Sequence, residues 1–313
     1  MFYITFLFNW KGVKMKYFLI IIIVLIALLF IYSFIEQQFI ETSSYILTYD
    51  NFPSETPLNI IVLADLHNRS FGKNNISLVK KIDEVKPDFI LLAGDMVTKH
   101  QLAMDSKSYK LIRDLSKRYK IYYGYGNHEQ KLDELAGEES PSKIKLYNSW
   151  KEYKTSLIEE GIIFLDNTNI SYSNSDNKNE GKKIKISGLT IDLDYYKPFK
   201  EEVLEENYLE SLKGDKDKSS FDIVIAHNPL YFPDYAKWGF DLIVSGHVHG
   251  GLVRLPFTKG ILSPQIKLFP KYSGGEYSIE KSKMILSRGL GSHSFMPRIF
   301  NRPELVNIIV AGK

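Results

Sequence analysis

Five short apolar runs, each ending in side chains able to bind a metal ion, constrain the fold of this chain more than any other feature. The runs cover residues 59–64, 89–93, 121–125, 221–226 and 240–245, and each has the length and composition of a buried β-strand. Helical patterns over residues 75–85 and up to about residue 118 separate the first three. A strand, helix, strand order predicts an α/β fold whose parallel strands bring their carboxyl ends to one edge of a sheet.

Polar side chains gather at these five strand ends. An Asp after a strand is usually a turn residue or a helix cap, and a single His is usually a hydrogen-bonded surface or core residue. Five coincidences of the same kind indicate a shared site, for which imidazole and carboxylate groups suit Mn, Fe or Zn. The chain has no cysteine, so thiolate ligands are excluded. The residues concerned are Asp65, His67, Asp95, Asn127, His128, His227, His247 and His249.

The N-terminal part differs from the rest, because residues 17–35 form an uncharged apolar run long enough to cross a bilayer. Lys11, Lys14 and Lys16 precede the run, whereas Glu36 and Glu41 follow it, so the positive-inside rule places the N-terminus in the cytoplasm. We therefore expect a single-pass protein of the cell membrane with its catalytic domain on the extracytoplasmic side. The expected segments are a cytoplasmic N-terminus (1–16), a transmembrane anchor (17–36), a connector (37–57) and one domain (58–313).

Three alternatives to this topology stay open. A cleaved signal peptide would have a shorter apolar region and a small-x-small cleavage site, and residues 33–36 offer none. Met15 would make a compact start to the anchor, so residues 1–14 need not be translated. The domain would face the cytoplasm instead if the lysines before the anchor do not determine its orientation.

The rest of the chain adds less. We expect a helix over 150–160, strands over 162–165 and 184–187, polar loops over 173–183 and 213–220, and antiparallel strands after residue 252. The formal net charge is +3, and no basic block is interleaved with aromatic residues, so nucleic acid is not indicated as a partner.

The strand-end motifs, taken in order, resemble the motif set of the calcineurin-like metallophosphoesterases over about residues 58–250. The second motif has Thr98 where an Asp is common, which leaves the ligand Asp95 in place. The run 246–256 with Arg254, and the tail segments 288–290 and 302–304, resemble more particularly the membrane-associated or exported bacterial phosphodiesterases of that superfamily. The motifs are Asp65-Leu66-His67, Gly94-Asp95, Gly126-Asn127-His128-Glu129, His227 and Gly246-His247-Val248-His249.

The resemblance implies a two-sheet αββα sandwich with a dinuclear metal site. Asp65, His67 and His249 would hold one ion, Asn127, His227 and His247 the other, and Asp95 would bridge them. Mn is the expected metal, with Fe or Zn as alternatives. Two such ions acidify a shared water and clamp the phosphoryl oxygens. The imidazolium of His128 would protonate the leaving oxygen, which suits a pKa near neutrality.

Substrate contacts are harder to assign. Arg254 and Arg288, and also Arg69 and Arg302, are candidates for a second phosphate contact, because guanidinium groups bind phosphate in a bidentate manner. Phe295-Met296-Pro297 is expected to be core rather than a lip for a lipid chain. Glu129, Asp222 and Asp241 are expected to be caps or surface residues rather than partners that orient the imidazoles.

We expect a membrane-anchored phosphodiesterase or pyrophosphatase that acts on an envelope phosphoester, such as that of a lipid or envelope head group. The alternatives are a phosphomonoesterase or nucleotidase, and a non-catalytic, metal-binding envelope scaffold.

Overall fold

The structure is a computed structural model that describes residues 2–53, 56–172, 183–197, 203–205, 207–210, 212, 220–251, 253–254, 260–262, 268–292 and 298–313. Apart from Lys183 and Ser220, the polar loops expected over 173–183 and 213–220 lie outside the described residues. The segment Phe295-Met296-Pro297 also lies outside them.

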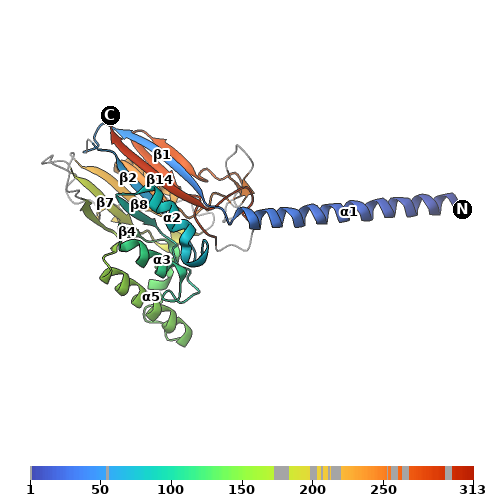
Figure 1. The fold of residues 1–313 in the computed structure, drawn as a ribbon, viewed down its shortest axis with the longest axis horizontal. Coiled ribbons are helices and arrows are strands. Elements are labelled where there is room, and N and C mark those ends of the chain that lie inside the picture. Colours follow the sequence, from blue (N-terminus) through green and yellow to red (C-terminus); the bar gives the residue numbers. More distant parts are fainter. Residues whose placement is uncertain are drawn as a thin grey trace.

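Two six-stranded sheets face each other in the described part of the chain (Figure 1). In spatial order, the first contains β1 (Glu41–Tyr49), β14 (Glu304–Gly312), β2 (Leu58–Leu63), β3 (Phe89–Ala93), β4 (Lys120–Gly124) and β5 (Ile163–Leu165). The second contains β12 (Gly275–Ile279), β13 (Ser282–Leu286), β9 (Leu242–Ser245), β8 (Phe221–Ala226), β7 (Ile184–Leu189) and β6 (Thr168–Tyr172). A two-stranded ribbon contains β10 (Val253–Arg254) and β11 (Gly260–Leu262).

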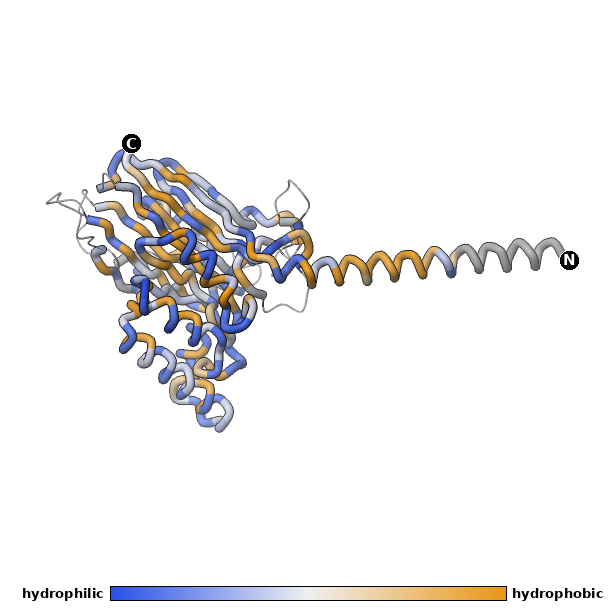
Figure 2. Tube along the Cα trace, in the orientation of Figure 1, coloured by the Kyte–Doolittle hydropathy of each residue, from blue (hydrophilic) through white to orange (hydrophobic). Residues whose placement is uncertain are grey.

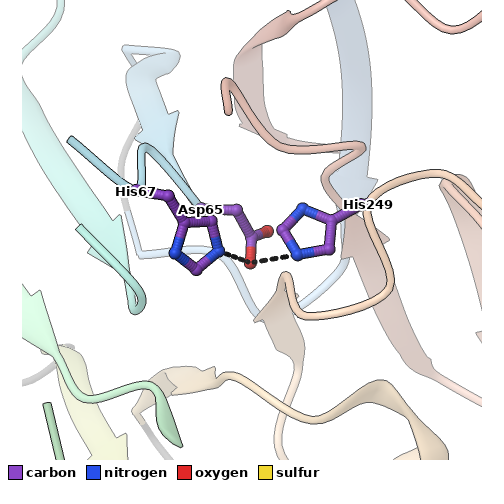
Figure 3. Close-up of side chains that lie close together, drawn as sticks. All are labelled: Asp65, His67 and His249. Carbon is purple, nitrogen blue, oxygen red and sulfur yellow. Dashed lines mark ion pairs between the residues drawn. The ribbon is translucent and has the colours of Figure 1, made fainter. Parts of the chain in front are cut away.

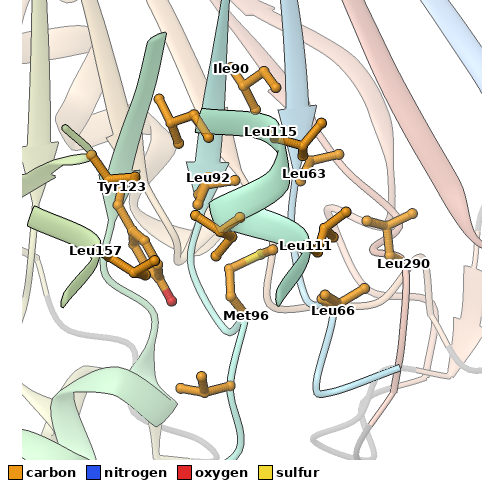
Figure 4. Packing of buried hydrophobic residues seen from close by; sticks show 14 of the residues in the cluster. Leu63, Leu66, Ile90, Leu92, Met96, Leu111, Leu115, Tyr123, Leu157 and Leu290 are labelled. Atoms are coloured by element: carbon orange, nitrogen blue, oxygen red, sulfur yellow. The ribbon is translucent and has the colours of Figure 1, made fainter. Parts of the chain in front are cut away.

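Strand β3 shows why the sheets are stacked as they are. Its five residues are all buried, and alternate side chains point to opposite faces. Phe89 and Leu91 join the core between the two sheets, whereas Ile90 and Leu92 join the core beneath the helices of the first sheet. Figure 4 shows the second of these cores, in which Leu111 and Leu115 pack onto the sheet. A continuous apolar run is therefore required of this strand.

Helices cover the outer faces of both sheets, which confirms the αββα sandwich. Leu78 and Ile82 of α2, Leu111 and Leu115 of α3, and Leu157 of α5 lie in the core on the first sheet. Phe232 and Tyr235 of α7 lie in the core on the second. The helices are α1 (Phe2–Glu36), α2 (Ile76–Val85), α3 (Lys107–Ser116), α4 (Asn127–Asp133), α5 (Pro141–Glu159), α6 (Asn207–Glu210), α7 (Phe232–Trp238) and the 3₁₀ turns η1 (Lys73–Asn75), η2 (Leu193–Tyr196) and η3 (Pro229–Tyr231).

Helix α1 projects away from the sandwich as a single long rod (Figure 1). Its segment Met15–Glu36 contains an 18-residue stretch with a mean hydropathy of 3.3 and is long enough to cross a membrane. Figure 2 shows this segment as an almost unbroken hydrophobic stretch. The structure thus has one N-terminal apolar helix of the kind expected for an anchor or a signal sequence.

The connector expected over residues 37–57 is wrong in part, because residues 41–49 form strand β1. This strand pairs in parallel with β14, so that Glu41 lies opposite Glu304. Its polar residues lie along an edge of the sheet, while Leu47 and Tyr49 are buried. An edge strand with one solvent-exposed face contains many polar residues and therefore resembles a polar linker in sequence, which explains the wrong prediction. Two further differences are that α5 begins at Pro141 rather than near residue 150, and that β6 was not predicted.

Candidate active site

The loops that follow β2, β3 and β9 carry most of the predicted metal ligands in a left-handed backbone conformation. Such a conformation costs roughly 1–2 kcal/mol for a residue other than glycine, and it clusters at functional sites where the surrounding structure enforces it. The φ angles are 51° for Asp65, 45° for His67, 53° for Asp95, 74° for His247 and 49° for His249.

Asp65, His67 and His249 form the first ligand group (Figure 3). The Nε2 atoms of His67 and His249 each lie 3.8 Å from Oδ1 of Asp65. Two atoms that bind one ion at about 2.0–2.2 Å are separated by about 3–4 Å, so these spacings suit a shared cation. The carboxylate of Asp65 is held in place by the backbone N–H of His247, 3.1 Å from each oxygen.

Asp95, His227 and His247 form the second group. The Nε2 atom of His227 lies 3.3 Å from Oδ2 of Asp95, and Nδ1 lies 2.6 Å from the carbonyl oxygen of Ala93. A proton on Nδ1 can be donated to that carbonyl, which leaves the Nε2 lone pair for a metal. Oδ2 of Asp95 also lies 3.7 Å from Nε2 of His67 in the first group. Asp95 therefore occupies the position expected of a bridging carboxylate.

Several buried polar atoms at the centre of the site have no hydrogen-bond partner among the described residues. They are Oδ2 of Asp95, Oδ1 of Asn127 and Nε2 of His227. A buried acceptor left unpaired costs about 1–3 kcal/mol, so three such atoms in one place require an explanation. All three are the types of atom that bind divalent cations, and the residues present therefore fit a metal site.

The charges in the site are strongly interdependent. Burial raises the pKa of Asp65 to about 7. Burial acts in the same direction on Asp95, but the imidazoles of His128 and His227 outweigh it and hold its pKa well below the usual range. Burial lowers the pKa of His227, yet the carboxylate of Asp95 more than compensates and raises it to about 9. The imidazolium form of His227 thus places positive charge beside Asp95, where a metal cation would bind.

His128 lies at the start of α4, directly beside Asp95. The backbone N–H of His128 donates to Oδ1 of Asp95 at 2.8 Å, and its Nε2 atom lies 4.0 Å from Oδ2. The backbone N–H of Lys99 donates to Nδ1 of His128 at 3.1 Å. In the neutral ring, this bond places the proton on Nε2, the nitrogen that faces the site.

The family model of calcineurin-like phosphoesterases matches residues 58–251, which is more than half of the chain and includes both ligand groups. The chain belongs to this family. The phosphoesterase is accordingly a metal-dependent hydrolase with candidate Asp and His groups for a dinuclear site.

Three known proteins show similarity to this chain at low sequence identity. An uncharacterised metallophosphoesterase of Campylobacter jejuni is 26% identical over 82% of this chain, and the chain spans 60% of that protein's length. The UDP-2,3-diacylglucosamine pyrophosphatase LpxG of Chlamydia muridarum is 24% identical over 79% of this chain and 82% of its own. The solved structure of the Haemophilus influenzae NAD nucleotidase NadN is 16% identical, with a TM-score of 0.40, and covers 75% of this chain and 46% of its own.

Glu129 of the phosphoesterase has a larger part in the site than the sequence indicated. It is fully buried and accepts hydrogen bonds from the backbone N–H groups of Asp95 at 2.8 Å, Met96 at 2.9 Å and Gly126 at 3.0 Å, and from the hydroxyl of Tyr123 at 2.8 Å. The bond to Gly126 is the expected helix cap. The others fix the loop that carries Asp95, and burial followed by the charge of Asp95 raises the pKa of Glu129 to about 7. Its place in the first turn of the helix after a buried strand was the available signal.

Asp222 and Asp241 lie at the other end of the strands. Asp222 is the second residue of β8, and Asp241 directly precedes β9. The N–H of Asp222 donates to Oδ2 of Asp241 at 2.8 Å. As expected, they do not orient the imidazoles.

The four arginines proposed for substrate binding all have protein contacts. Arg254 donates to the carbonyls of Gly250 at 2.9 Å and Ser273 at 3.1 Å. Arg288 pairs with Glu304 at 2.9 Å and with Glu41 at 3.1 Å. Arg69 binds Gln37, and Arg302 lies 3.6 Å from Glu36. Because Gly250 follows His249 directly, Arg254 is next to the metal loop, and its role toward substrate stays a prediction.

Proposed function

We propose that this phosphoesterase hydrolyses a phosphodiester or pyrophosphate bond of an envelope compound with the help of two divalent ions, with Mn as the expected metal and Fe or Zn as the alternatives. One observation carries the proposal. Oδ2 of Asp95 is buried, has no hydrogen-bond partner among the described residues, and lies 3.7 Å from Nε2 of His67 and 3.3 Å from Nε2 of His227. A single carboxylate oxygen thus joins the two ligand groups.

The proposed division of the ligands is the one that the resemblance implies. Asp65, His67 and His249 would hold one ion, Asn127, His227 and His247 the other, and Asp95 both. When bound, such ions polarise the phosphoryl oxygens and lower the pKa of water. Asn127 contributes an oxygen without negative charge, so the site keeps positive character toward an anionic substrate.

His128 is the proposed proton donor. Its Nδ1 accepts from Lys99, which leaves an Nε2–H group facing the site. In the neutral ring that group can hydrogen-bond to the leaving oxygen, and in the imidazolium form it would also supply the proton that this oxygen needs. Arg254 and Arg288 are the proposed contacts for an outer phosphate oxygen; burial, and then the charge of Arg288, lower the pKa of Arg254.

The membrane setting rests on α1. The lysines before its apolar segment and the acidic residues after it favour a single-pass protein of the cell membrane with the sandwich outside. The relative named UDP-2,3-diacylglucosamine pyrophosphatase supports a pyrophosphate or phosphodiester bond in an amphiphilic substrate. A reporter fused after Lys313 tests the orientation, and cytoplasmic reporter activity would reverse it.

The chemistry is tested with the full chain in detergent, stripped of metal and resupplied with Mn, Fe, Zn or Mg. We expect metal-dependent cleavage of bis-p-nitrophenyl phosphate. Cleavage of p-nitrophenyl phosphate alone would favour a phosphomonoesterase or nucleotidase instead. Two bound metals without turnover of either ester would favour the non-catalytic scaffold.

A further inference from the structure

Helix α1 enters the sandwich at the edge where the metal ligands emerge. Strand β1 runs parallel to β14, with Glu41 opposite Glu304. Strand β14 runs antiparallel to β2, with Val306 opposite Val62. The beginning of β1 therefore lies at the carboxyl end of β2, the end from which the chain continues to Asp65.

The last turn of α1 is built into the domain by specific contacts. The hydroxyl of Ser33 donates to the carbonyl of Arg298 at 2.6 Å, and the N–H of Asn301 donates to Oε2 of Glu36 at 3.2 Å. The rings of Tyr32 and Phe300 lie 5.2 Å apart. Ser33 and Glu36 are buried, although the rest of the apolar segment is exposed. Removal of α1 would leave these domain groups uncovered, which supports an uncleaved helix.

The same contacts lead directly to the metal loops. The side-chain amide of Asn301 donates to the carbonyls of His249 and Gly251, both at 2.7 Å. Arg69, two residues after His67, donates to Oε1 of Gln37 at 2.7 Å. Asn301 thus connects the end of α1 to the loop of His249, and Arg69 connects it to the loop of His67. Because of these contacts, the direction of the helix fixes the orientation of the metal site relative to the surroundings of the helix.

Four large apolar side chains are exposed around this junction, and we refer to them as the apolar rim: Phe39, Leu268, Phe269 and Phe300. Phe39 follows α1 by three residues and Phe300 packs on Tyr32. Leu268 and Phe269 bridge to β11, through Leu262 and Ile261. Their exposed fractions are 68% and 75%.

The ribbon β10–β11 carries Leu268 and Phe269 to the same side of the molecule as α1. Val253 of β10 forms a β-bridge with Ile299, and the N–H of Arg254 donates to the carbonyl of Ile299 at 3.0 Å. Ile299 lies between Arg298 and Phe300, which both contact the last turn of α1. Figure 1 shows this C-terminal part of the chain gathered where α1 leaves the sandwich. Exposed apolar clusters of this kind mark interaction sites.

We propose that the apolar rim seats the sandwich on the bilayer crossed by α1, so that the metal site opens at head-group depth and takes the phosphoester of a bilayer-embedded amphiphile. Continuity with the apolar helix identifies the bilayer as the partner. The seating rests on α1 and the rim alone, whereas the choice of substrate rests on the proposed function.

Spin labels test the seating, since the chain has no cysteine of its own. The full chain carrying Leu268→Cys or Phe269→Cys is labelled with a nitroxide in nanodiscs of phosphatidylcholine and phosphatidylglycerol. Ile158→Cys is the control, because Ile158 is also apolar and 53% exposed but lies on α5. We expect the labels at 268 and 269 to meet oxygen more often than a water-soluble nickel chelate, and the label at 158 to show the reverse. Equal chelate access at all three positions would overturn the seating.

A matched pair of diesters tests the substrate class. Hexadecyl p-nitrophenyl phosphate inserts into the nanodisc, whereas ethyl p-nitrophenyl phosphate stays in water, and both have the same leaving group. We expect Leu268→Glu with Phe269→Glu to lower hydrolysis of the hexadecyl ester about tenfold and to leave the ethyl ester unchanged, while Ile158→Glu alters neither. Unchanged hydrolysis of both esters by the double variant would overturn the substrate class. If the native chain cleaves neither ester with metals bound, the proposed function fails, and the spin labels still decide the seating.

Discussion

The side chain of Asn301 donates a hydrogen bond of 2.7 Å to the backbone carbonyl of His249, although the two residues are 52 positions apart. A second bond of the same length reaches Gly251. His249 has a left-handed φ of 49°, so its imidazole depends on its backbone being held in an unfavourable conformation. Asn301 is therefore a positioning residue for a candidate metal ligand.

The first prediction concerns this clamp. Asn301→Ala removes both bonds and should weaken metal binding by about tenfold or more, as is typical when a partner of a ligand is lost. Isothermal titration of the metal-stripped full chain with Mn measures the effect. Asn167→Ala is the control, because Asn167 clamps Thr190 through two similar bonds away from the ligands. Equal metal affinity in the two variants would contradict the positioning role.

The second prediction concerns the buried carboxylate of Glu129. In Glu129→Gln, an amide NH₂ replaces one oxygen and meets backbone N–H groups that need an acceptor, so unfolding should become easier by about 3 kcal/mol. Denaturant unfolding measures the change. Glu160→Gln, which alters an exposed pair with Arg113, should cost less than about 1 kcal/mol. A similar small loss for Glu129→Gln would show that its hydrogen bonds are replaceable.

The third prediction tests the bridging carboxylate. Asp95→Asn keeps the size of the side chain but removes the charge that two cations would share, so hydrolysis of bis-p-nitrophenyl phosphate should fall by at least about 100-fold. Circular dichroism should show the fold retained. Asp222→Asn, at the opposite end of the strands, should keep its activity. Substantial turnover by Asp95→Asn at saturating Mn would rule out the proposed mechanism.

The fourth prediction tests His128 as a proton donor. His128→Ala should slow hydrolysis more for esters with poor leaving groups than for p-nitrophenyl esters, because p-nitrophenolate needs little protonation. Rates for a series of aryl esters of graded leaving-group pKa measure this dependence. His100→Ala, an exposed histidine two residues after Thr98, should leave the series unchanged. Equal losses across the series would remove the acid role from His128.

The fifth prediction distinguishes the effects of Arg288 and Arg254 on stability and on substrate binding. Arg288→Ala removes the positively charged partner of the buried carboxylate of Glu304 and should destabilise the fold by roughly 3–5 kcal/mol. Arg254→Ala removes the hydrogen bonds to the neutral carbonyls of Gly250 and Ser273, so its expected effect is a raised KM for the diester with a smaller loss of stability. Thermal unfolding and steady-state kinetics measure both. An unchanged KM in Arg254→Ala would exclude Arg254 as a phosphate contact.

The sequence predicted the parts of the fold in which local pattern and burial agree. The expected strand over 89–93 coincides with β3, because a parallel strand covered on both faces must be apolar throughout. The clustering of the candidate ligands could be predicted for a related reason. Parallel strands of one sheet end at one edge, so the residues after Leu63 and Ala93 are brought together by topology, whereas the residues after Ser245 belong to the second sheet and join them through the stacking of the two sheets.

The sequence failed where a residue's role depends on a distant partner. Strand β1 is recognisable only once β14 lies beside it, at positions more than 260 residues later. The polar residue Ser33 inside an apolar helix has no evident purpose until Arg298 is placed next to it. Glu129 was expected to cap its own helix, which it does, but its bonds to Asp95 and Met96 come from a neighbouring loop. None of these contacts leaves a periodic signal.

The insertion of β14 between β1 and β2 has a consequence for biogenesis. Strand β1 directly follows the apolar helix, yet its partner β14 is synthesised more than 250 residues later. The first sheet can close only after residues 304–312 have left the ribosome, and a chain that stops before residue 304 would expose the edges of both β1 and β2. Synthesis of β14 is therefore a condition for a closed sheet, and cellular proteases could use the open edges to recognise molecules that lack it.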